Sequence, residues 1–294
     1  MSTMRGTRRT FVTGLIAGAG SLVLGFDPVR RSWVTSAFAA NSVIAIPHLD
    51  GTLLTDPATL SAFGDDFGHI VHHAPIAVLE PGSVQDIVRA VTFCRQHGIE
   101  VAMRGQGHST QGQSQALAGL VIDSSKLNAI EHIGSDYAIV QAGVRWIDFL
   151  AKSEPMGLRP PVITGFTGLS VGGTISMGGI GPASFRYGAI VDNVLELDVV
   201  TGNGDLRTCS LTEDPILFAA VVGGVGQYGI IVRAKVRLVS VLPFARNYVI
   251  SYGDFPTMFG DMNTLIDGGK VDGVYAIFGP APTPSGFGYQ LNIV

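Results

Sequence analysis

Short apolar runs and one helical pattern follow each other along residues 76–125. Three apolar runs are typical of buried strands; they cover residues 76–81, 99–104 and 119–125. Between the first two runs, apolar side chains recur at helical spacing, with Ser83 at the N-cap position and Gly98 after the last turn. This stretch is therefore predicted to form a strand, an amphipathic helix and two further strands.

Further along, apolar and polar residues alternate, which indicates strands with one buried face. Such strands are predicted at residues 137–143, in a hairpin at 194–210 and at 230–240. Helices are predicted at residues 144–154 and from Asp214 and Pro215 onward. The order of elements predicts a mixed α+β fold.

Changes in composition along the chain indicate four segments, the first of which is residues 1–40. The mixed α+β domain is assigned to residues 70–244, and residues 41–69 are assigned to a segment leading into it. After "LPFAR" the chain changes to short, aromatic-rich runs, which predicts a second domain over residues 245–294. Hydrophobic residues make up 46% of the chain and charged residues 14%, so a sizeable core is available.

The first 40 residues resemble a twin-arginine export signal. Arg8 and Arg9 precede an uncharged apolar stretch at residues 10–26, and "SAFAAN" offers a small-x-small cleavage site near Ala39 or Ala40. A basic amphipathic helix fits less well, because the apolar stretch has no polar face. The signal predicts a protein exported to the periplasm or the extracellular space. It also hints at a bound cofactor, because this route carries proteins that are already folded.

Charge and cysteine content narrow the possible partners. The chain has 19 Lys and Arg against 23 Asp and Glu, and residues 1–40 hold five of the former and one of the latter. The remainder thus has a net charge near −8, which argues against nucleic-acid binding. No other run of about 18 apolar residues predicts a membrane span. We expect a small-molecule substrate, with the oligomeric state left open, and two buried free thiols, Cys94 and Cys209.

The segment "RGQGHSTQGQS" at residues 104–114 is the strongest local indication of function. Successive N–H groups of a glycine-rich turn form a nest that suits a pyrophosphate, and hydroxyl and amide side chains can add hydrogen bonds. A lone histidine is commonly an ordinary core residue. His108 instead sits between Gly107 and Ser109, where no core is expected, so we favour a cofactor role.

Two other motifs are weaker. Gly224, Gly226 and Gly229 satisfy G-x-G-x-x-G, but a helix precedes them and a strand follows, the reverse of the dinucleotide fingerprint, so that interpretation is rejected. The segment "HIVHH" at residues 69–73 has spacing compatible with metal ligands, yet no second ligand cluster accompanies it. A solvated segment is favoured there, and no metal site is predicted.

Three long motifs together resemble the FAD-binding (PCMH-type) domain of the vanillyl-alcohol oxidase family, with cytokinin dehydrogenases and bacterial relatives most similar. They are "RGQGHSTQGQ", "GLSVGGTISMGGIGPASFRYGAIVDNVLELDVVTGNG" and "LFAAVVGGVGQYGIIVRAKV", and they extend over about residues 70–245. The resemblance implies a two-subdomain FAD-binding fold followed by the beginning of a substrate domain that residues 245–294 leave incomplete.

The resemblance also implies roles for particular residues. His108 matches the family histidine that bonds covalently to the methyl group at C8 of the flavin. The other positions implied to contact FAD are Gly105, Gln106, Gly107, Ser109, Gln113, Ser170, Ser176, Ile180 and Ile231. In berberine-bridge relatives a second, cysteinyl tether occupies the position of Phe166, so a single tether is implied here.

One departure affects the chemistry. Cytokinin dehydrogenases carry an aspartate, which accepts a proton from the substrate amine, at the position of Gly165, and glycine cannot act as a base. The catalytic base is therefore left unknown. The expected activity is FAD-dependent removal of a hydride from a carbon next to nitrogen or oxygen, in an amine, an alcohol or a sugar. The alternative is a truncated, non-catalytic remnant that binds flavin.

Overall fold

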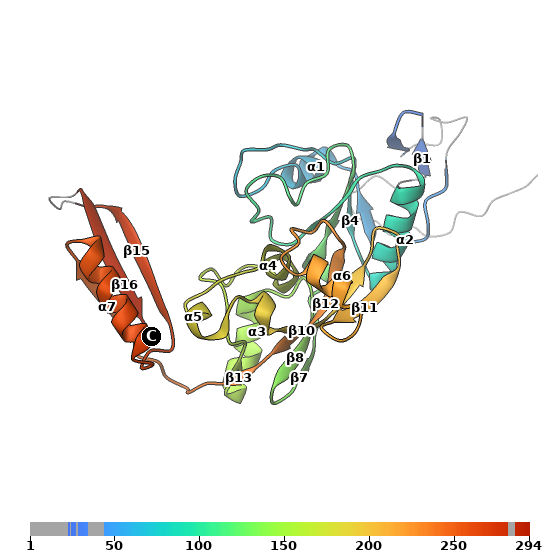
Figure 1. The fold of residues 1–294 in the computed structure, drawn as a ribbon. Helices are drawn as coiled ribbons and strands as arrows, with labels where there is room; N and C mark the ends of the chain where they lie inside the picture. The colour runs from blue at the N-terminus through green and yellow to red at the C-terminus, as the bar shows by residue number, and fades with distance from the viewer. Residues whose placement is uncertain (1–22, 24, 28, 35–43, 282–285) are drawn as a thin grey trace, which may run out of the picture.

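The computed structural model describes the chain except for residues 1–22, 24, 28, 35–43 and 282–285 (Figure 1). Most of the predicted export signal, including its arginine pair and its cleavage site, lies outside the described residues. Among the described residues, no helix is long and apolar enough to cross a membrane. Cys94 and Cys209 are free and buried, which confirms that prediction.

The first subdomain is built on a four-stranded sheet in the order β3-β4-β6-β5. Its strands are β3 (Thr52–Leu54), β4 (Ala77–Glu80), β5 (Val101–Arg104) and β6 (Leu120–Asp123). Strands β4, β6 and β5 run parallel, and helix α2 (Val84–Gln96) connects β4 to β5. These are the strands and the helix that the apolar runs predict. Strand β3 and helix α1 (Pro57–Phe63) come from the segment expected to lead into the domain.

Alternating side chains of the strands fill two layers of core. Leu79 and Ile122 face α2, whereas Val78 and Val121 face α1 on the other side of the sheet. The hydroxyl of Ser83 accepts a hydrogen bond from the backbone N–H of Asp86, as expected for the N-cap. A helix on each face therefore buries this small parallel sheet.

The second subdomain is a five-stranded antiparallel sheet in the order β11-β10-β12-β8-β7. Its strands are β7 (Ile130–Ile133), β8 (Tyr137–Gln141), β10 (Val194–Val200), β11 (Leu206–Ser210) and β12 (Ile230–Arg237). Helices α3 (Trp146–Ser153), α4 (Val171–Met177) and α6 (Pro215–Val221) supply the rest of its core. Together the two subdomains confirm the α+β class.

Shorter elements complete these two subdomains. They are helix α5 (Ser184–Tyr187), the two-residue strands β9 (Leu158–Arg159) and β13 (Val239–Ser240), and 3-10 turns at Ser124–Lys126, Glu154–Met156 and Val191–Asn193. Strands β9 and β13 pair with each other just before the chain leaves the second subdomain.

A hairpin near the N-terminus packs against helix α2. It consists of β1 (Gly25–Asp27) and β2 (Ser32–Val34). Phe26 is fully buried and contacts both Trp33 and Phe93, and its backbone pairs with Ile44. Residues assigned to the predicted export signal thus contribute to the hydrophobic core around α2.

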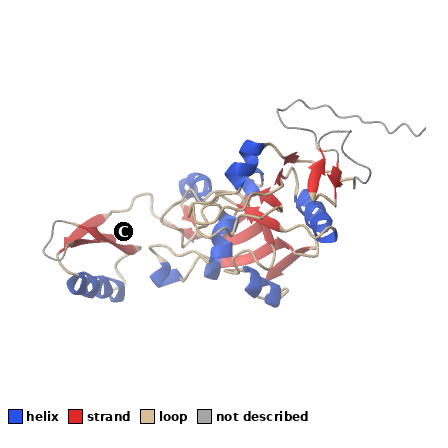
Figure 2. Cartoon of the chain, turned by 90° about the horizontal axis from the view of Figure 1, so that it is seen from above, coloured by secondary structure: helices blue, strands red, loops and turns tan. Residues whose placement is uncertain are grey.

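Residues 248–281 and 286–294 form a separate unit beside the second subdomain (Figures 1 and 2). Strands β14 (Tyr248–Tyr252), β16 (Phe287–Ile293) and β15 (Val274–Pro280) form a sheet in that order, and helix α7 (Phe255–Asp267) covers one face. The sequence patterns did not predict α7, because Gly260 interrupts a stretch with few strong helix formers. Asp254 caps this helix by accepting a hydrogen bond from Thr257 N–H.

The C-terminal unit contacts the second subdomain beside α5. The guanidinium of Arg186 donates to the carbonyl of Val271 and forms an ion pair with Asp272, at 3.0 and 3.1 Å. The backbone N–H of Val274 donates to the carbonyl of Pro182. The unit is therefore attached at residues 182–186, just after the glycine-rich stretch at residues 172–181.

Candidate functional site

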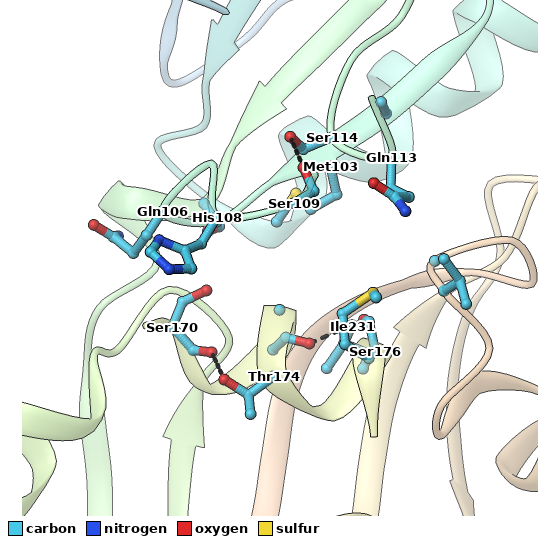
Figure 3. A pocket seen from close by; sticks show the side chains of 18 of the residues that line it. Met103, Gln106, His108, Ser109, Gln113, Ser114, Ser170, Thr174, Ser176 and Ile231 are labelled. Atoms are coloured by element: carbon cyan, nitrogen blue, oxygen red, sulfur yellow. Dashed lines mark hydrogen bonds between the residues drawn. The ribbon is translucent and has the colours of Figure 1, made fainter. Parts of the chain in front are cut away.

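A cavity of about 520 Å³ lies between the two subdomains (Figure 3). Three segments supply most of its lining: residues 101–115, which comprise β5 and the loop after it; residues 164–179, around α4; and residues 225–231, which lead into β12. This volume is within the range of small-molecule and cofactor sites. The loop after β5, in the first subdomain, and helix α4, in the second subdomain, thus face each other across one cavity.

The lining of this cavity is almost free of charge. Among its described residues, His108 is the only ionisable side chain. The rest are glycines, aliphatic side chains, and hydroxyl or amide groups such as those of Thr174, Ser176, Gln106 and Gln227. Such a lining suits a ligand with a large uncharged ring system and a diphosphate that is bound by N–H and O–H donors.

Glycines allow the segments to approach closely at two positions. Gly107 has a φ of +65°, and a Cβ atom there would lie 2.3 Å from the Arg104 guanidinium. A Cβ atom on Gly105 would lie 2.2 Å from the hydroxyl oxygen of Ser170, which belongs to the opposite segment. A side chain at Gly105 would displace the hydroxyl of Ser170, and one at Gly107 would displace the Arg104 guanidinium and strain the backbone, because φ is positive there.

Asp66 anchors loop 104–114 from outside the cavity. Its side chain is only 3% exposed, and its carboxylate accepts hydrogen bonds from the hydroxyl of Ser109 and from the N–H groups of Gly112 and Gly68, at 3.0, 2.8 and 3.1 Å. Sequence reasoning missed Asp66. The letters "GDDFG" indicate a turn, but they do not show that it meets a loop 43 residues away.

The imidazole ring of His108 lies between two phenylalanine rings at the edge of the cavity. Its centroid is 4.1 Å from that of Phe67 and 5.2 Å from that of Phe166, with interplanar angles of 19° and 24°. The side chain of His108 is exposed despite this stacking. Its ring faces are therefore covered while the residue stays accessible.

The structure brings together nine of the ten residues predicted to contact the cofactor. Gly105, Gln106, Gly107, His108, Ser109, Gln113, Ser170, Ser176 and Ile231 all line the cavity. Ile180 does not line it, and its side chain is 75% exposed just beyond α4. The contact of each residue with a cofactor stays a prediction.

Sequence reasoning missed two further parts of the lining. Ser124 is 2% exposed and lines the cavity, and its hydroxyl has no hydrogen-bond partner among the described residues. Residues 225–229 also line it. The helix-then-strand order that excludes the dinucleotide fingerprint is confirmed, since these residues lie between α6 and β12. An orphaned buried hydroxyl in the wall fits a cavity that holds a polar ligand.

No carboxylate stands ready to act as a base in the described lining. Gly165 is not part of it, and a Cβ atom there would meet nothing within 4 Å. Asp148, on helix α3, is exposed and forms two hydrogen bonds with Arg145. The bond from Arg145 holds the pKa of Asp148 below its usual range, which makes this carboxylate a weak base.

The histidines of "HIVHH" lie outside the cavity. The Nδ1 atoms of His69 and His72 are 2.7 and 3.3 Å from the Asp65 carboxylate, and both side chains are largely exposed. Within the described part of the chain, no three His, Cys, Asp or Glu residues are arranged to hold a metal ion. These contacts order the surface of the turn that carries Asp66 and Phe67.

The two subdomains thus enclose a cavity between glycine-rich segments, with His108 as the only ionisable side chain of its described lining. Residues 75–210 match the family model of the FAD binding domain, and the chain contains this domain. The cofactor of the domain is therefore FAD.

Three relatives make the comparison more specific. The uncharacterized oxidoreductase of the fasciation locus of Rhodococcoides fascians is 40% identical over 213 residues, which are 72% of this chain and 49% of the relative. Cytokinin dehydrogenase 2 of Arabidopsis thaliana is 41% identical over 221 residues, 74% of this chain and 44% of the relative. Cytokinin dehydrogenase 4 of the same plant is 38% identical over 258 residues, or 81% and 49%. The chain thus spans about half the length of these relatives.

Proposed function

We propose that this chain is the flavin-binding part of an FAD-dependent oxidoreductase that removes a hydride from a carbon next to nitrogen or oxygen. The observation that carries the proposal is the cavity itself. Loop 104–114 and the segment around α4, residues 164–179, meet across it, and its described lining is uncharged except for His108. The similarity to cytokinin dehydrogenases supports the reaction class, and the substrate is proposed to be an amine, an alcohol or a sugar.

The residues of the lining divide naturally into two roles. The N–H groups of loop 104–114 and the unpartnered hydroxyl of Ser124 would hold the diphosphate and the sugar chain of FAD, because the hydroxyls of Ser109 and Ser176 already donate to Asp66 and to the carbonyl of Gly172. Aliphatic side chains such as Ile231 would pack against its ring. When bound, FAD supplies the hydride acceptor, and the protein supplies position and electrostatics.

His108 is proposed to hold the flavin covalently. A ring nitrogen of His108 would form a bond to the carbon of the methyl group at C8, and one C–H bond of that methyl group breaks. The proton from this bond, the proton of the imidazole N–H and two electrons pass to the ring system. Dioxygen then takes up both protons and both electrons and becomes hydrogen peroxide. The exposed position of His108 at the cavity edge supports this assignment.

A second candidate, a flavin-binding remnant without catalysis, is favoured by one observation. The described lining contains no carboxylate, and glycine occupies position 165. General-base assistance is typically worth about 10²–10⁴-fold in rate. A lining that lacks this group would hold FAD without turning over a substrate.

Purified protein distinguishes these proposals. Denaturation in acid followed by gel electrophoresis is expected to leave flavin fluorescence on the protein band, and His108→Ala is expected to abolish it. Protein that is yellow before denaturation but gives a dark band would overturn the tether. Rapid bleaching of the flavin by an amine, alcohol or sugar under anaerobic conditions would exclude the non-catalytic candidate, whereas no bleaching with any of them would exclude the oxidoreductase.

A further inference from the structure

The backbone of Phe67 and Gly68 runs alongside the residues that flank His108. The N–H of Phe67 donates to the carbonyl of Gly107 at 2.9 Å, and the N–H of Gly68 donates to the carbonyl of Ser109 at 3.2 Å. These two bonds set Phe67 directly opposite His108. The turn at residues 65–69, which lies between α1 and β4, is thus joined to loop 104–114 on both sides of His108.

The close approach of this turn depends on the absence of a side chain at Gly68. A Cβ atom at that position would lie 2.1 Å from the carbonyl oxygen of Thr110. The Asp66 carboxylate secures the same turn through Ser109 and Gly112. The position of Phe67 relative to His108 is therefore fixed by backbone bonds and a buried carboxylate, and does not rely on stacking alone.

Phe67 and Phe166 are large apolar side chains left open to solvent. They are 60% and 58% exposed, so they contribute little to the core. Each nevertheless stacks on a face of His108, and they come from segments about 100 residues apart. Exposed phenylalanines that enclose one functional side chain indicate a role in positioning it.

We propose that Phe67 and Phe166 form an aromatic bracket that orients the imidazole of His108 for bonding to the flavin methyl group. The inference rests on the proposed tether. Stacking against the two phenylalanine rings opposes rotation of the imidazole about its Cβ–Cγ bond, so the bracket fixes the plane of the ring and with it the direction of the ring nitrogens at the cavity edge. Bond formation needs this orientation, because the nitrogen lone pair lies in the plane of the imidazole. The two phenylalanines are thus positioning residues and are not catalytic.

The test compares covalent with total flavin in the whole chain after expression with excess FAD. Phe67→Leu and Phe166→Leu keep apolar volume but remove the stacking, and the double variant removes both contacts. From the strength of aromatic pairs, each single change is expected to slow covalent attachment about two- to tenfold, while total bound FAD stays near that of the wild type. Phe67→Tyr and Phe166→Tyr are expected to restore attachment.

Phe259→Leu is the matched control. Phe259 is also an exposed aromatic residue in a stacked pair, with Phe255 on α7, outside the cavity. Its replacement is expected to change neither quantity. Covalent flavin in the wild type together with unchanged attachment in the double variant would overturn the bracket alone. A wild type without covalent flavin would overturn both the tether and the bracket.

Discussion

The carboxylate of Asp66 accepts a hydrogen bond from the hydroxyl of Ser109, at 3.0 Å, across 43 residues of sequence. Ser109 immediately follows His108, so this contact connects the turn at residues 65–69 to the cavity wall. Asp66 is buried, and it also accepts from the N–H groups of Gly112 and Gly68. One carboxylate thus satisfies two donors of the loop that is proposed to bind FAD and one donor of its own turn.

Asp66→Ala is expected to destabilise the protein by about 1–3 kcal/mol, because buried donors of Ser109 and Gly112 lose their partner. FAD binding is expected to weaken as well, since the loop loses its anchor. Urea unfolding monitored by circular dichroism and titration with FAD measure the two effects. Asp65→Asn is the control, because that neighbouring carboxylate contacts only exposed histidine side chains and the N–H of Asp66. Equal losses in both variants would contradict the anchoring role.

Ser124→Ala is expected to weaken FAD binding about two- to tenfold without lowering the stability of the FAD-free protein. The reason is that the buried hydroxyl has no partner until a ligand supplies one. Ser153→Ala is a close control, since Ser153 is also buried with an unpartnered hydroxyl but does not line the cavity. The two variants should differ in FAD affinity, measured by isothermal titration, but not in the thermal stability of the FAD-free protein, measured by thermal melts.

Gly165→Asp is expected to increase the rate of flavin reduction by an amine. A side chain fits there, because a Cβ atom would meet nothing within 4 Å, and a base at this position contributes about 10²–10⁴-fold in general-base catalysis. Stopped-flow measurement of flavin bleaching with an isoprenoid adenine checks this. Gly202→Asp, in the β10–β11 turn and equally unobstructed, adds the same charge as a control. No gain over that control would indicate that the base lies elsewhere.

Phe26→Ala is expected to destabilise the full chain by about 1–3 kcal/mol. A buried phenylalanine usually costs about 3–5 kcal/mol when truncated, but a hairpin near a chain end can detach and limit the loss. Val29→Ala, at an exposed position of the same hairpin, should have no effect.

We also propose export by the twin-arginine route. Sequencing the N-terminus of exported protein would then show whether cleavage near Ala39 removes this hairpin.

Cys94 is expected to resist alkylation in the folded protein and to react only on unfolding. Burial raises the pKa of its thiol to about 12, so the reactive thiolate is scarce in mildly alkaline solution. The unfolded thiol has an ordinary pKa near 9, so unfolding releases a proton above that pH. The stabilising contribution is complete below about 9 and is lost as the pH rises toward 12. Cys94→Ala should flatten this part of the stability profile.

Local patterns determined the class of the fold and most of its elements. Helix α2 begins after Ser83 as predicted, and the apolar runs around it became strands β4, β5 and β6. Helix α7 was missed, because glycine within it weakens the local preference and burial of Met258 against the sheet compensates. The type of an element follows from the periodicity of its apolar residues, but whether a helix with a weak local preference forms depends on the surface against which it packs.

The sequence by itself also identified loop 104–114 and nine of the residues that line the cavity, His108 among them, because glycine spacing and motif order are local properties. Only the tertiary structure showed that Asp66 and Phe67 reach this loop, that Ser124 has an orphaned hydroxyl in the cavity wall, and that Ile180 does not line it. These facts depend on which segments meet in space. Hydrogen bonds and stacking across 40 or more residues leave no periodic trace in the chain.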